Sequence, residues 1–356
     1  MSLWLCLDSF ITTLSWVPWV FTSSSNLTID SIASGYLIRA LILGFLHLLP
    51  RHISLHSYFH RCILLVSILF VVSVIVVGTP ATFGHFVLFM CSWHLLIACR
   101  QFNAYHTYYD SGVIGYRRPE SDHIGTLSAI WFVYIFIALL KWFGVDNPSL
   151  FLQFVLVVGF IGLFICTYVP AVPLSHDLSL QSHPFPYQFR VIRAIASRYS
   201  YELYILSLYW FYTSIWVFFG TGIGAIVAYL WVLYASSSID QRLVICGCAS
   251  GVVVSTWILF IMSDIPPLMT SVLIGVNSAS LGLLSFSHTC MKESTHYHEV
   301  TSIYIYSQAT IHILIAVCLL CIRYYWFILP SIICLCTSIQ VLSSWYTERN
   351  ESLIEV

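Results

Sequence analysis

Three ionisable side chains stand within or beside long apolar stretches, and they are the residues best suited to chemistry. Arg39 lies about ten residues into an apolar run, where a charge costs several kcal/mol unless it is paired or hydrated. It could hold an anionic group, or it could be a structural arginine that pairs with a neighbour or extends toward water. Asp8 and Glu202 carry carboxylates that can bind and release a proton, although both stand near the ends of their runs, where water reaches them.

Histidine is the other abundant ligating residue, with 14 copies, but its spacing does not favour a metal site. His56 and His60 are four residues apart, and His296 and His298 flank a tyrosine. Neither pair is part of the HExxH motif of a catalytic zinc site. The sequence also lacks a phosphate-binding glycine loop and a hydrolase nucleophile motif. We therefore predict no metal, no cofactor, no nucleic-acid partner and no enzymatic activity.

The elements that must position these residues are helices in a membrane. The chain is 59% hydrophobic and 8% charged, with a mean hydropathy of +0.88. A soluble domain is about one quarter charged, so a water-soluble fold is excluded. Backbone polar groups in lipid must be satisfied within their own segment, which makes each apolar run a helix. The predicted fold class is therefore an all-α integral membrane protein.

We interpret twelve apolar runs as membrane spans, six on each side of residues 170–200, of which the fourth and eighth are short at 16 residues. Trp16, Trp19 and Tyr324 lie near the ends of runs, as interfacial aromatic residues do. The predicted transmembrane helices are Leu3–Val20, Ile29–Leu49, Cys62–Val77, Gly84–Cys99, Ile124–Phe143, Leu150–Val169, Tyr201–Phe219, Gly220–Ala235, Leu243–Met262, Pro266–Phe286, Val300–Ile322 and Tyr324–Ser344.

The basic residues predict the orientation of these helices. With the N-terminus in the cytoplasm, 11 of the 14 Lys and Arg fall on the cytoplasmic side. Lys141 and Arg323 fall outside, and Arg39 lies within a span. This bias follows the positive-inside rule and places both termini in the cytoplasm. The cytoplasmic set is Arg51, Arg61, Arg100, Arg117, Arg118, Arg190, Arg193, Arg198, Arg242, Lys292 and Arg349.

The longest stretch that cannot be an apolar helix is residues 170–200, which is rich in proline and arginine. Arg190, Arg193 and Arg198 have helical spacing within it and could lie as an amphipathic segment on anionic lipid. The predicted organisation is a six-helix half over residues 1–169, a cytoplasmic connector over residues 170–200, a second six-helix half over residues 201–346 and a cytoplasmic tail over residues 347–356.

Two six-helix halves joined by a long basic connector resemble the major facilitator superfamily of transporters, in its bacterial form. The segment LTIDSIASGYLIRALILGFLHLLPRH, Leu27–His52, is similar to that family's second helix and the loop after it. Leu281–Ile313 is similar to the end of the tenth helix, the Lys-Glu loop and the eleventh helix. The resemblance implies a transporter in the cell (inner) membrane that moves a small polar or anionic solute by alternating access.

In the resembled fold, helices one, four, seven and ten line a central cavity, and this implies the site residues. Arg39 is expected to contact the solute or to gate the cavity. Asp8 and Glu202 are the candidate carboxylates for coupling to a proton, and sodium is the other coupling ion considered. Membrane lipid is the remaining expected partner. The further substrate-binding or gating candidates are Trp16, Trp93, His94, Tyr204, Tyr209 and Asn277.

Two other functions stay open at this point. Leu48 and Leu49 stand where the family's loop carries Asp and Arg, and the chain has only 17 glycines for packing helices. Both features are compatible with a transporter fold kept as a scaffold or receptor without transport. A polytopic membrane enzyme acting on lipid is the other alternative, and it would need polar residues clustered at one membrane face. The three functions differ in where polar side chains gather.

Overall fold

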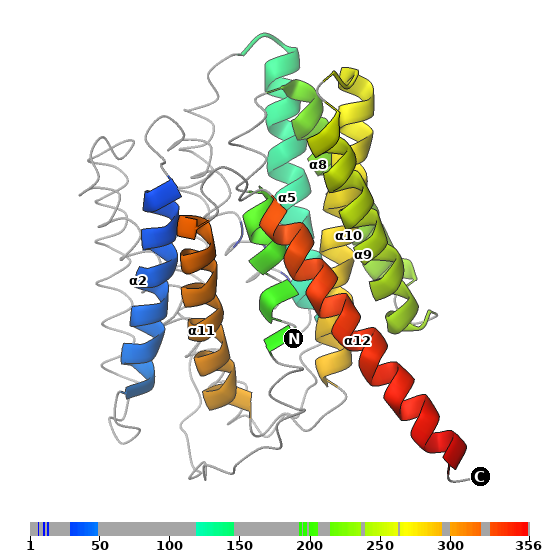
Figure 1. Ribbon diagram of the computed structural model, residues 1–356. Coiled ribbons are helices and arrows are strands. Elements are labelled where there is room, and N and C mark those ends of the chain that lie inside the picture. Colours follow the sequence, from blue (N-terminus) through cyan, green and yellow to red (C-terminus); the bar gives the residue numbers. More distant parts are fainter. Residues whose placement is uncertain are drawn as a thin grey trace. The chain divides into compact units, whose positions relative to one another are not determined.

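The computed structural model describes ten stretches of the chain together with residues 6, 10 and 13. The stretches are residues 29–48, 119–145, 192–193, 195–197, 199–205, 214–235, 239–262, 264–293, 300–321 and 328–354. The elements named in them are all α-helices (Figure 1). They are α2 (Ile29–Leu48), α5 (Pro119–Trp142), α8 (Ile215–Tyr234), α9 (Gln241–Ile261), α10 (Pro267–Glu293), α11 (Val300–Cys321) and α12 (Leu329–Ile354). The described residues between 192 and 205 are helical as well.

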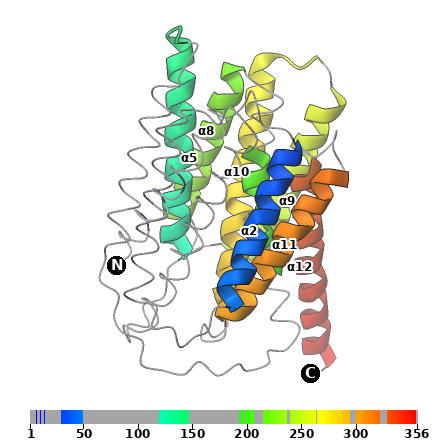
Figure 2. The ribbon, with the colours of Figure 1, turned by 90° about the vertical axis from the view of Figure 1, so that its left-hand side faces the viewer.

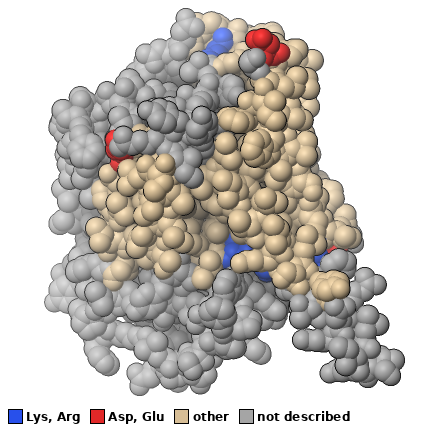
Figure 3. All heavy atoms as spheres, viewed as in Figure 1, with Lys and Arg blue, Asp and Glu red and all other residues tan. Residues whose placement is uncertain are grey.

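Four segments of these helices are long and apolar enough to cross a membrane, and they are His123–Trp142, Ile215–Tyr234, Gln241–Ile261 and Pro267–His288. The outward faces are apolar too, since Ile223, Val227 and Leu230 form an exposed stripe along α8. Figure 3 shows the described surface as a broad uncharged area with few charged atoms. A helix that is apolar on its buried and exposed faces is typical of a membrane span. Shorter apolar helices are Ile32–Gly44, Gln308–Cys321 and Leu329–Ser343.

Prolines and capping side chains explain where several helices begin. Pro119 is the first residue of α5, Pro267 is the first of α10, and Pro330 is the second of α12. The first turn of a helix leaves its N–H groups unused, so a residue without an N–H fits there. Ser214 and Asp240 cap α8 and α9, each accepting a hydrogen bond from the backbone N–H two residues later.

Several predicted boundaries differ from the structure. α5 begins at Pro119 rather than Ile124, and α10 ends at Glu293 rather than Phe286. The hydropathy pattern places the junction of the seventh and eighth spans between Phe219 and Gly220, but α8 begins at Ile215. The helix starts at the Ser214 cap, and Gly220 lies inside it. The twelfth span is expected over Tyr324–Ser344, whereas α12 runs over Leu329–Ile354. Its polar last turns continue the helix beyond the apolar run. The first, third, fourth and sixth predicted spans lie largely or wholly outside the described residues, so the total of twelve stays a prediction.

The chain forms two compact units that interleave along the sequence. The first comprises Met1–Arg118, Ser149–Ile192 and His296–Tyr324, and the second comprises Pro119–Pro148, Arg193–Thr295 and Tyr325–Val356. In the first unit, α2 packs against α11, and the two helices lie side by side in both views (Figure 1, Figure 2). In the second unit, α8 packs against both α5 and α10, while α9 packs against α10 and α12.

These helix pairs connect the two predicted halves of the sequence. The pair α2–α11 and the pair α5–α8 each join a helix from residues 1–169 to one from residues 201–346. Each pair belongs to one compact unit. The division of the chain into halves at residues 170–200 stays a prediction.

Glycines set the close packing of α8. Gly220 and Gly224 are four residues apart and face α10, where a Cβ on either would run into backbone atoms of that helix. Gly222 points to the other side, and a Cβ there would lie 2.6 Å from Cδ1 of Ile135 on α5. Helix backbones approach this closely only where no side chain intervenes. The chain has few glycines, and three of them stand where α8 meets two neighbours.

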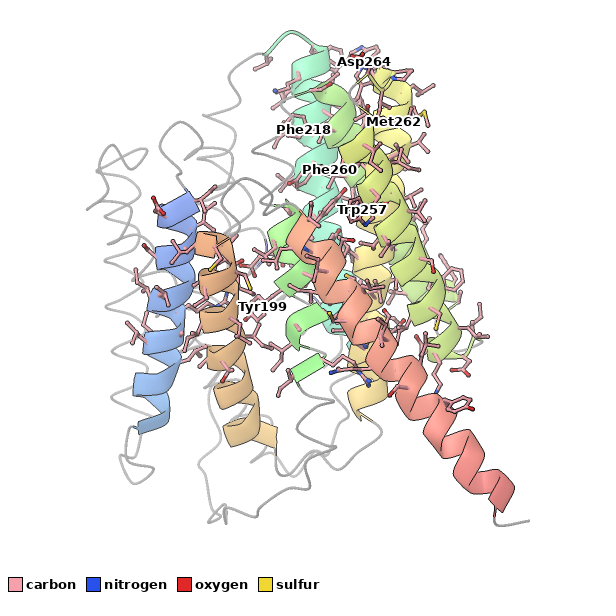
Figure 4. The ribbon with its side chains drawn as sticks, in the orientation of Figure 1. Tyr199, Phe218, Trp257, Phe260, Met262 and Asp264 are labelled. Carbon is pink, nitrogen blue, oxygen red and sulfur yellow. The ribbon has the colours of Figure 1, made fainter. Side chains whose placement is uncertain are left out.

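Aromatic side chains gather toward the end of α9 that leads into α10. Trp257 and Phe260 are exposed and lie edge to face, with ring centroids 5.8 Å apart (Figure 4). Met262 and Asp264 follow in the connection. Exposed aromatic rings beside a charged turn are typical of the headgroup level of a bilayer. α9 therefore runs between two polar levels, one marked by Asp240 and the other by Asp264.

Candidate functional site

Arg39 lies near the middle of α2, and its surface is only 7% exposed. Tyr36 on α2 and Gln308 and His312 on α11 are also buried. The guanidinium of Arg39 interacts electrostatically with the imidazole of His312. The rings of Tyr36 and His312 have centroids 5.6 Å apart. We call these four residues the Arg39 site. Here a charge within a membrane helix lies near polar groups of a second helix, which is the environment such charges need.

The His312 ring is oriented by its own helix. Its Nδ1 donates a hydrogen bond to the backbone carbonyl of Gln308, one turn earlier. A carbonyl oxygen only accepts, so Nδ1 carries the proton, and Nε2 of the neutral ring is an acceptor. An acceptor nitrogen is complementary to a guanidinium, which only donates. The ring therefore places an acceptor nitrogen, rather than a second positive charge, near the guanidinium of Arg39.

Two predicted cavity-lining residues lie on helices that pack together in the second unit. Tyr204 is buried, and its hydroxyl donates to the carbonyl of Ile274 on α10 at 3.1 Å. Asn277, further along α10, donates from Nδ2 to Oγ1 of Thr256 on α9 at 2.7 Å. The Oδ1 atom of Asn277 is buried and accepts no hydrogen bond within the described part of the chain. Both side chains fasten α10 to a neighbour, and their contact with a solute stays a prediction.

The other predicted site residues are distributed as follows. Glu202 is partly buried on the helical stretch that ends at residue 205. Arg39 belongs to the first compact unit, while Glu202, Tyr204 and Asn277 belong to the second. The roles assigned to all of them remain predictions. The residues that lie outside the described part are Asp8, Trp16, Trp93, His94 and Tyr209.

A second buried polar group lies where α5 begins and α10 ends. His123 Nε2 is 3.2 Å from Ser285 Oγ, and the His123 ring meets Phe286 edge to face. Arg193 is buried, and its guanidinium interacts electrostatically with the buried imidazole of His288. The expectation that Arg193 lies on the membrane surface is therefore wrong. The helix has already begun at residue 192, and Arg193 faces the inside of the second unit.

Sequence reasoning missed His123, His288 and His312 as site residues. It considered histidine mainly as a metal ligand, whereas these three imidazoles are buried within helices near other polar groups. A signal was available for His312, which stands inside the predicted span Val300–Ile322. An imidazole within a membrane helix needs a polar partner for the same reason that Arg39 does.

Both buried groups consist of side chains that could bind an anionic or polar ligand. Arginine supplies the charge, and imidazole, hydroxyl and amide groups supply the remaining polar contacts. Among the described residues, no three His, Cys, Asp or Glu side chains gather in a group that could hold a metal ion. The pairs His56 and His60, and His296 and His298, lie outside those residues.

Comparison with known proteins gives matches among solved structures. No protein-family model matches the sequence, and no curated protein matches it. The chain is similar to the crystal structure of the nucleoside transporter NupG, with a TM-score of 0.54 and 12% identity over 97% of this chain and 98% of that one. It is also similar to a bacterial homologue of the iron transporter ferroportin in an outward-facing state, with a TM-score of 0.54 and 11% identity over 96% and 98% of the two chains.

The likeness covers nearly the whole chain and concerns the fold. It confirms the predicted all-helical fold class. The structural likeness and the four apolar helices long enough to cross a bilayer together indicate an integral membrane protein.

Proposed function

We propose that the chain is a secondary transporter that moves a small polar or anionic solute across the membrane by alternating access. The fold that it shares with two transporters over nearly its full length supports this proposal. The pairing of α2 with α11 and of α5 with α8 supports it as well. Helices from the two predicted halves meet in these pairs, so a rocking motion of one half against the other would act on them directly.

The observation that carries the proposal is the burial of Arg39 against α11. A buried guanidinium in a membrane helix is costly and is rarely kept without a function. Arg39 would contact an anionic group of the solute, or it would hold α2 to α11 in one state and release it in the other. In either case the electrostatic interaction with His312 links a residue of the first predicted half to one of the second.

The remaining assignments complete the proposed mechanism. Both termini lie in the cytoplasm, the membrane is the cell (inner) membrane, and residues 1–169 and 201–346 form the two moving halves. The solute site would be completed by Trp16, Trp93, His94, Tyr204, Tyr209 and Asn277. Asp8 and Glu202 would carry a coupling proton, with sodium as the alternative ion.

The two similar structures suggest which solutes to test. Their titles name a nucleoside transporter and a homologue of an iron transporter. A nucleoside fits a site of hydroxyl, amide and aromatic side chains, whereas a buried arginine disfavours a metal cation. Nucleosides and small carboxylates are therefore the first solutes to test for uptake, and ferrous iron is the negative control.

The test is uptake of labelled solutes by a transporter-deficient host that expresses the full chain. We expect accumulation of one solute and a decrease of about tenfold or more in Arg39→Gln, since the lost contacts are charge-assisted. Arg39→Lys separates solute contact from gating, because lysine keeps the positive charge but lacks the planar set of guanidinium donors. A raised KM would indicate solute contact, and a lowered maximal rate would indicate gating. Arg242→Gln, at the start of α9, is the matched control and should transport normally.

Two results would overturn the proposal. If the Arg39→Gln variant takes up solute at the wild-type rate, Arg39 has no role in transport. If folded, membrane-inserted protein accumulates no solute at all, transport itself is refuted, and the scaffold or receptor alternative takes its place.

The enzyme alternative has one observation in its favour. His123 Nε2 and Ser285 Oγ are 3.2 Å apart, close to the spacing of a base and a nucleophile. Both side chains are buried, however, and Ser285 lies within the continuous helix α10. Backbone N–H groups inside a helix are engaged in its own hydrogen bonds, so they are not free to stabilise an oxyanion beside the serine. Transport is therefore the function that the geometry supports best.

A further inference from the structure

Five buried polar side chains meet where α5 begins and α10 ends. They come from three helical segments of the second compact unit. His288 is 1% exposed, and Arg193 is 7% exposed. We call this group the Arg193 cluster, and its members are His123, Arg193, Ser197, Ser285 and His288.

The contacts among these residues place them together. His123 Nε2 lies 3.2 Å from Ser285 Oγ, which joins the first turns of α5 to α10. His288 follows Ser285 by three residues, so both lie on the same side of α10. Arg193 interacts electrostatically with His288. Ser197 follows Arg193 by four residues, so it lies on the same side of that helical stretch.

Part of this cluster has unused hydrogen-bonding capacity. Neither ring nitrogen of His288 has a hydrogen-bond partner within the described part of the chain, and the same holds for Ser197 Oγ. Buried polar groups of folded proteins are nearly always paired, so an unpaired imidazole in the interior needs an explanation. A ligand that accepts hydrogen bonds would supply the missing partner.

The chemistry of the side chains identifies the class of ligand. The guanidinium of Arg193 donates only, each neutral imidazole can donate from one nitrogen, and the serine hydroxyls can donate. Their natural complement is an oxyanion, which brings negative charge and several acceptor oxygens.

We propose that the Arg193 cluster binds an oxyanion, either a phosphate or a carboxylate group. Arg193 would neutralise its charge, and His288 and Ser197 would donate hydrogen bonds to its oxygens. His123 and Ser285, already bonded to each other, would close the site between α5 and α10. The site is separate from Arg39, which lies in the other compact unit, so it does not depend on the proposed transport.

The oxyanion could reach the site as a soluble ion or as the headgroup of an anionic lipid. The purified full chain is therefore placed in nanodiscs of phosphatidylcholine alone and titrated with orthophosphate or succinate at constant ionic strength. A second preparation contains phosphatidylglycerol and receives no soluble anion. The thermal unfolding midpoint is measured in each, and binding of labelled phosphate is measured alongside.

We expect a saturable rise of the unfolding midpoint with at least one of these anions. Arg193→Gln and His288→Leu should each weaken that binding about tenfold or more, since bonds to charged groups are lost. Arg242→Gln removes an arginine outside the cluster and should bind as the wild type does. A rise with soluble anion identifies an ion site, whereas a rise only with phosphatidylglycerol identifies a lipid site.

His288→Leu keeps the proposal testable if Arg193→Gln does not fold. An imidazole without a partner is replaced by an apolar side chain of similar size, so the variant should fold. If His288 has a packing role only, the variant will be as stable as the wild type or more stable, and its response to anion will be unchanged. That result would overturn the proposal, as would a wild type that responds to none of the three anions.

Discussion

The imidazole of His312 on α11 lies against the phenol ring of Tyr36 on α2, with centroids 5.6 Å apart and ring planes inclined by 31°. Arg39, three residues after Tyr36 on the same helix, interacts electrostatically with that imidazole. The His312 ring therefore receives both an aromatic contact and an electrostatic interaction from α2. Since α2 and α11 come from different predicted halves, the proposed movement of the halves would act on this ring.

The first prediction concerns His312. His312→Phe keeps an aromatic ring beside Tyr36 but removes both ring nitrogens. We expect uptake of the transported solute to decrease about tenfold or more, because Arg39 loses a polar neighbour. The unfolding midpoint should stay close to that of the wild type, because the ring packing remains. Ile313→Phe places the same ring at the next, exposed position and should leave uptake unchanged. Normal uptake by His312→Phe would show that the imidazole has only a packing role.

The second prediction concerns the glycines of α8. Gly220→Ala should destabilise the protein by about 1–3 kcal/mol, because the new methyl group meets the backbone of α10, which cannot yield. Gly247→Ala is the control, since nothing lies within 4 Å of a Cβ there. It should be neutral or slightly stabilising, because alanine favours a helix over glycine. Unfolding midpoints in detergent measure both, and equal stability of the two variants would contradict the close approach.

The third prediction follows from the different neighbour of Gly222. A methyl group there meets Cδ1 and Cγ1 of the Ile135 side chain, at 2.6 and 2.7 Å, rather than a neighbouring backbone alone. Gly222→Ala should therefore be rescued by Ile135→Ala, which removes both of these atoms. The double variant should unfold at a higher temperature than Gly222→Ala. Ile135→Ala should give no such rescue to Gly220→Ala, and rescue of both would argue against two separate helix contacts.

The fourth prediction tests the hydrogen bond between Asn277 and Thr256. A double-mutant cycle with Asn277→Leu and Thr256→Val should give a coupling energy of about 0.6–1.7 kcal/mol, the range of hydrogen bonds between membrane helices. If Asn277 binds solute as well, Asn277→Leu should also raise the KM of uptake, while Thr256→Val should not. A coupling energy near zero would show that the bond at 2.7 Å contributes little to stability.

The fifth prediction concerns orientation. α9 runs from the turn at Asp240 to the turn at Asp264, so reporters inserted in these two turns must lie on opposite sides of the membrane. Alkaline phosphatase should be active after Asp264 and inactive after Asp240, because the positive-inside rule places Arg242 in the cytoplasm. A fluorescent reporter that matures only in the cytoplasm should give the reverse pattern. Exchange of the two results would reverse the proposed orientation of the chain.

Hydropathy was sufficient to locate most of the described helices. α2, α9 and α11 begin and end within two residues of the predicted spans, because each apolar run is bounded by polar residues or turns. The start of α10 at Pro267 also agrees with the prediction to within one residue, whereas α5 begins at Pro119, before the predicted Ile124. Where two apolar runs follow each other closely, as around Ser214, hydropathy carries no boundary signal. There a single capping hydroxyl decides where the helix begins.

The candidate site was less accessible to sequence reasoning. Arg39 stood out because a charge interrupts an apolar run, and its burial agrees with that expectation. Its neighbours did not stand out, because a helix that is apolar on all sides gives no indication of which face meets which partner. The position of His312 beside Arg39 depends on how α2 and α11 are rotated against each other. The burial of Arg193 likewise depends on where a helix begins, and composition alone does not give that.

The glycines of α8 also bear on how this sequence can change over time. Positions 220, 222 and 224 accept almost no side chain, whereas lipid-facing positions such as Ile223 and Val227 require only that the residue be apolar. Substitution is therefore expected to run freely on the outward faces and to stop at a few inward contacts. When only a few inward contacts are constrained, sequence similarity between membrane proteins is lost long before the arrangement of their helices changes. An identity of 12% alongside a similar fold is compatible with this pattern of constraint.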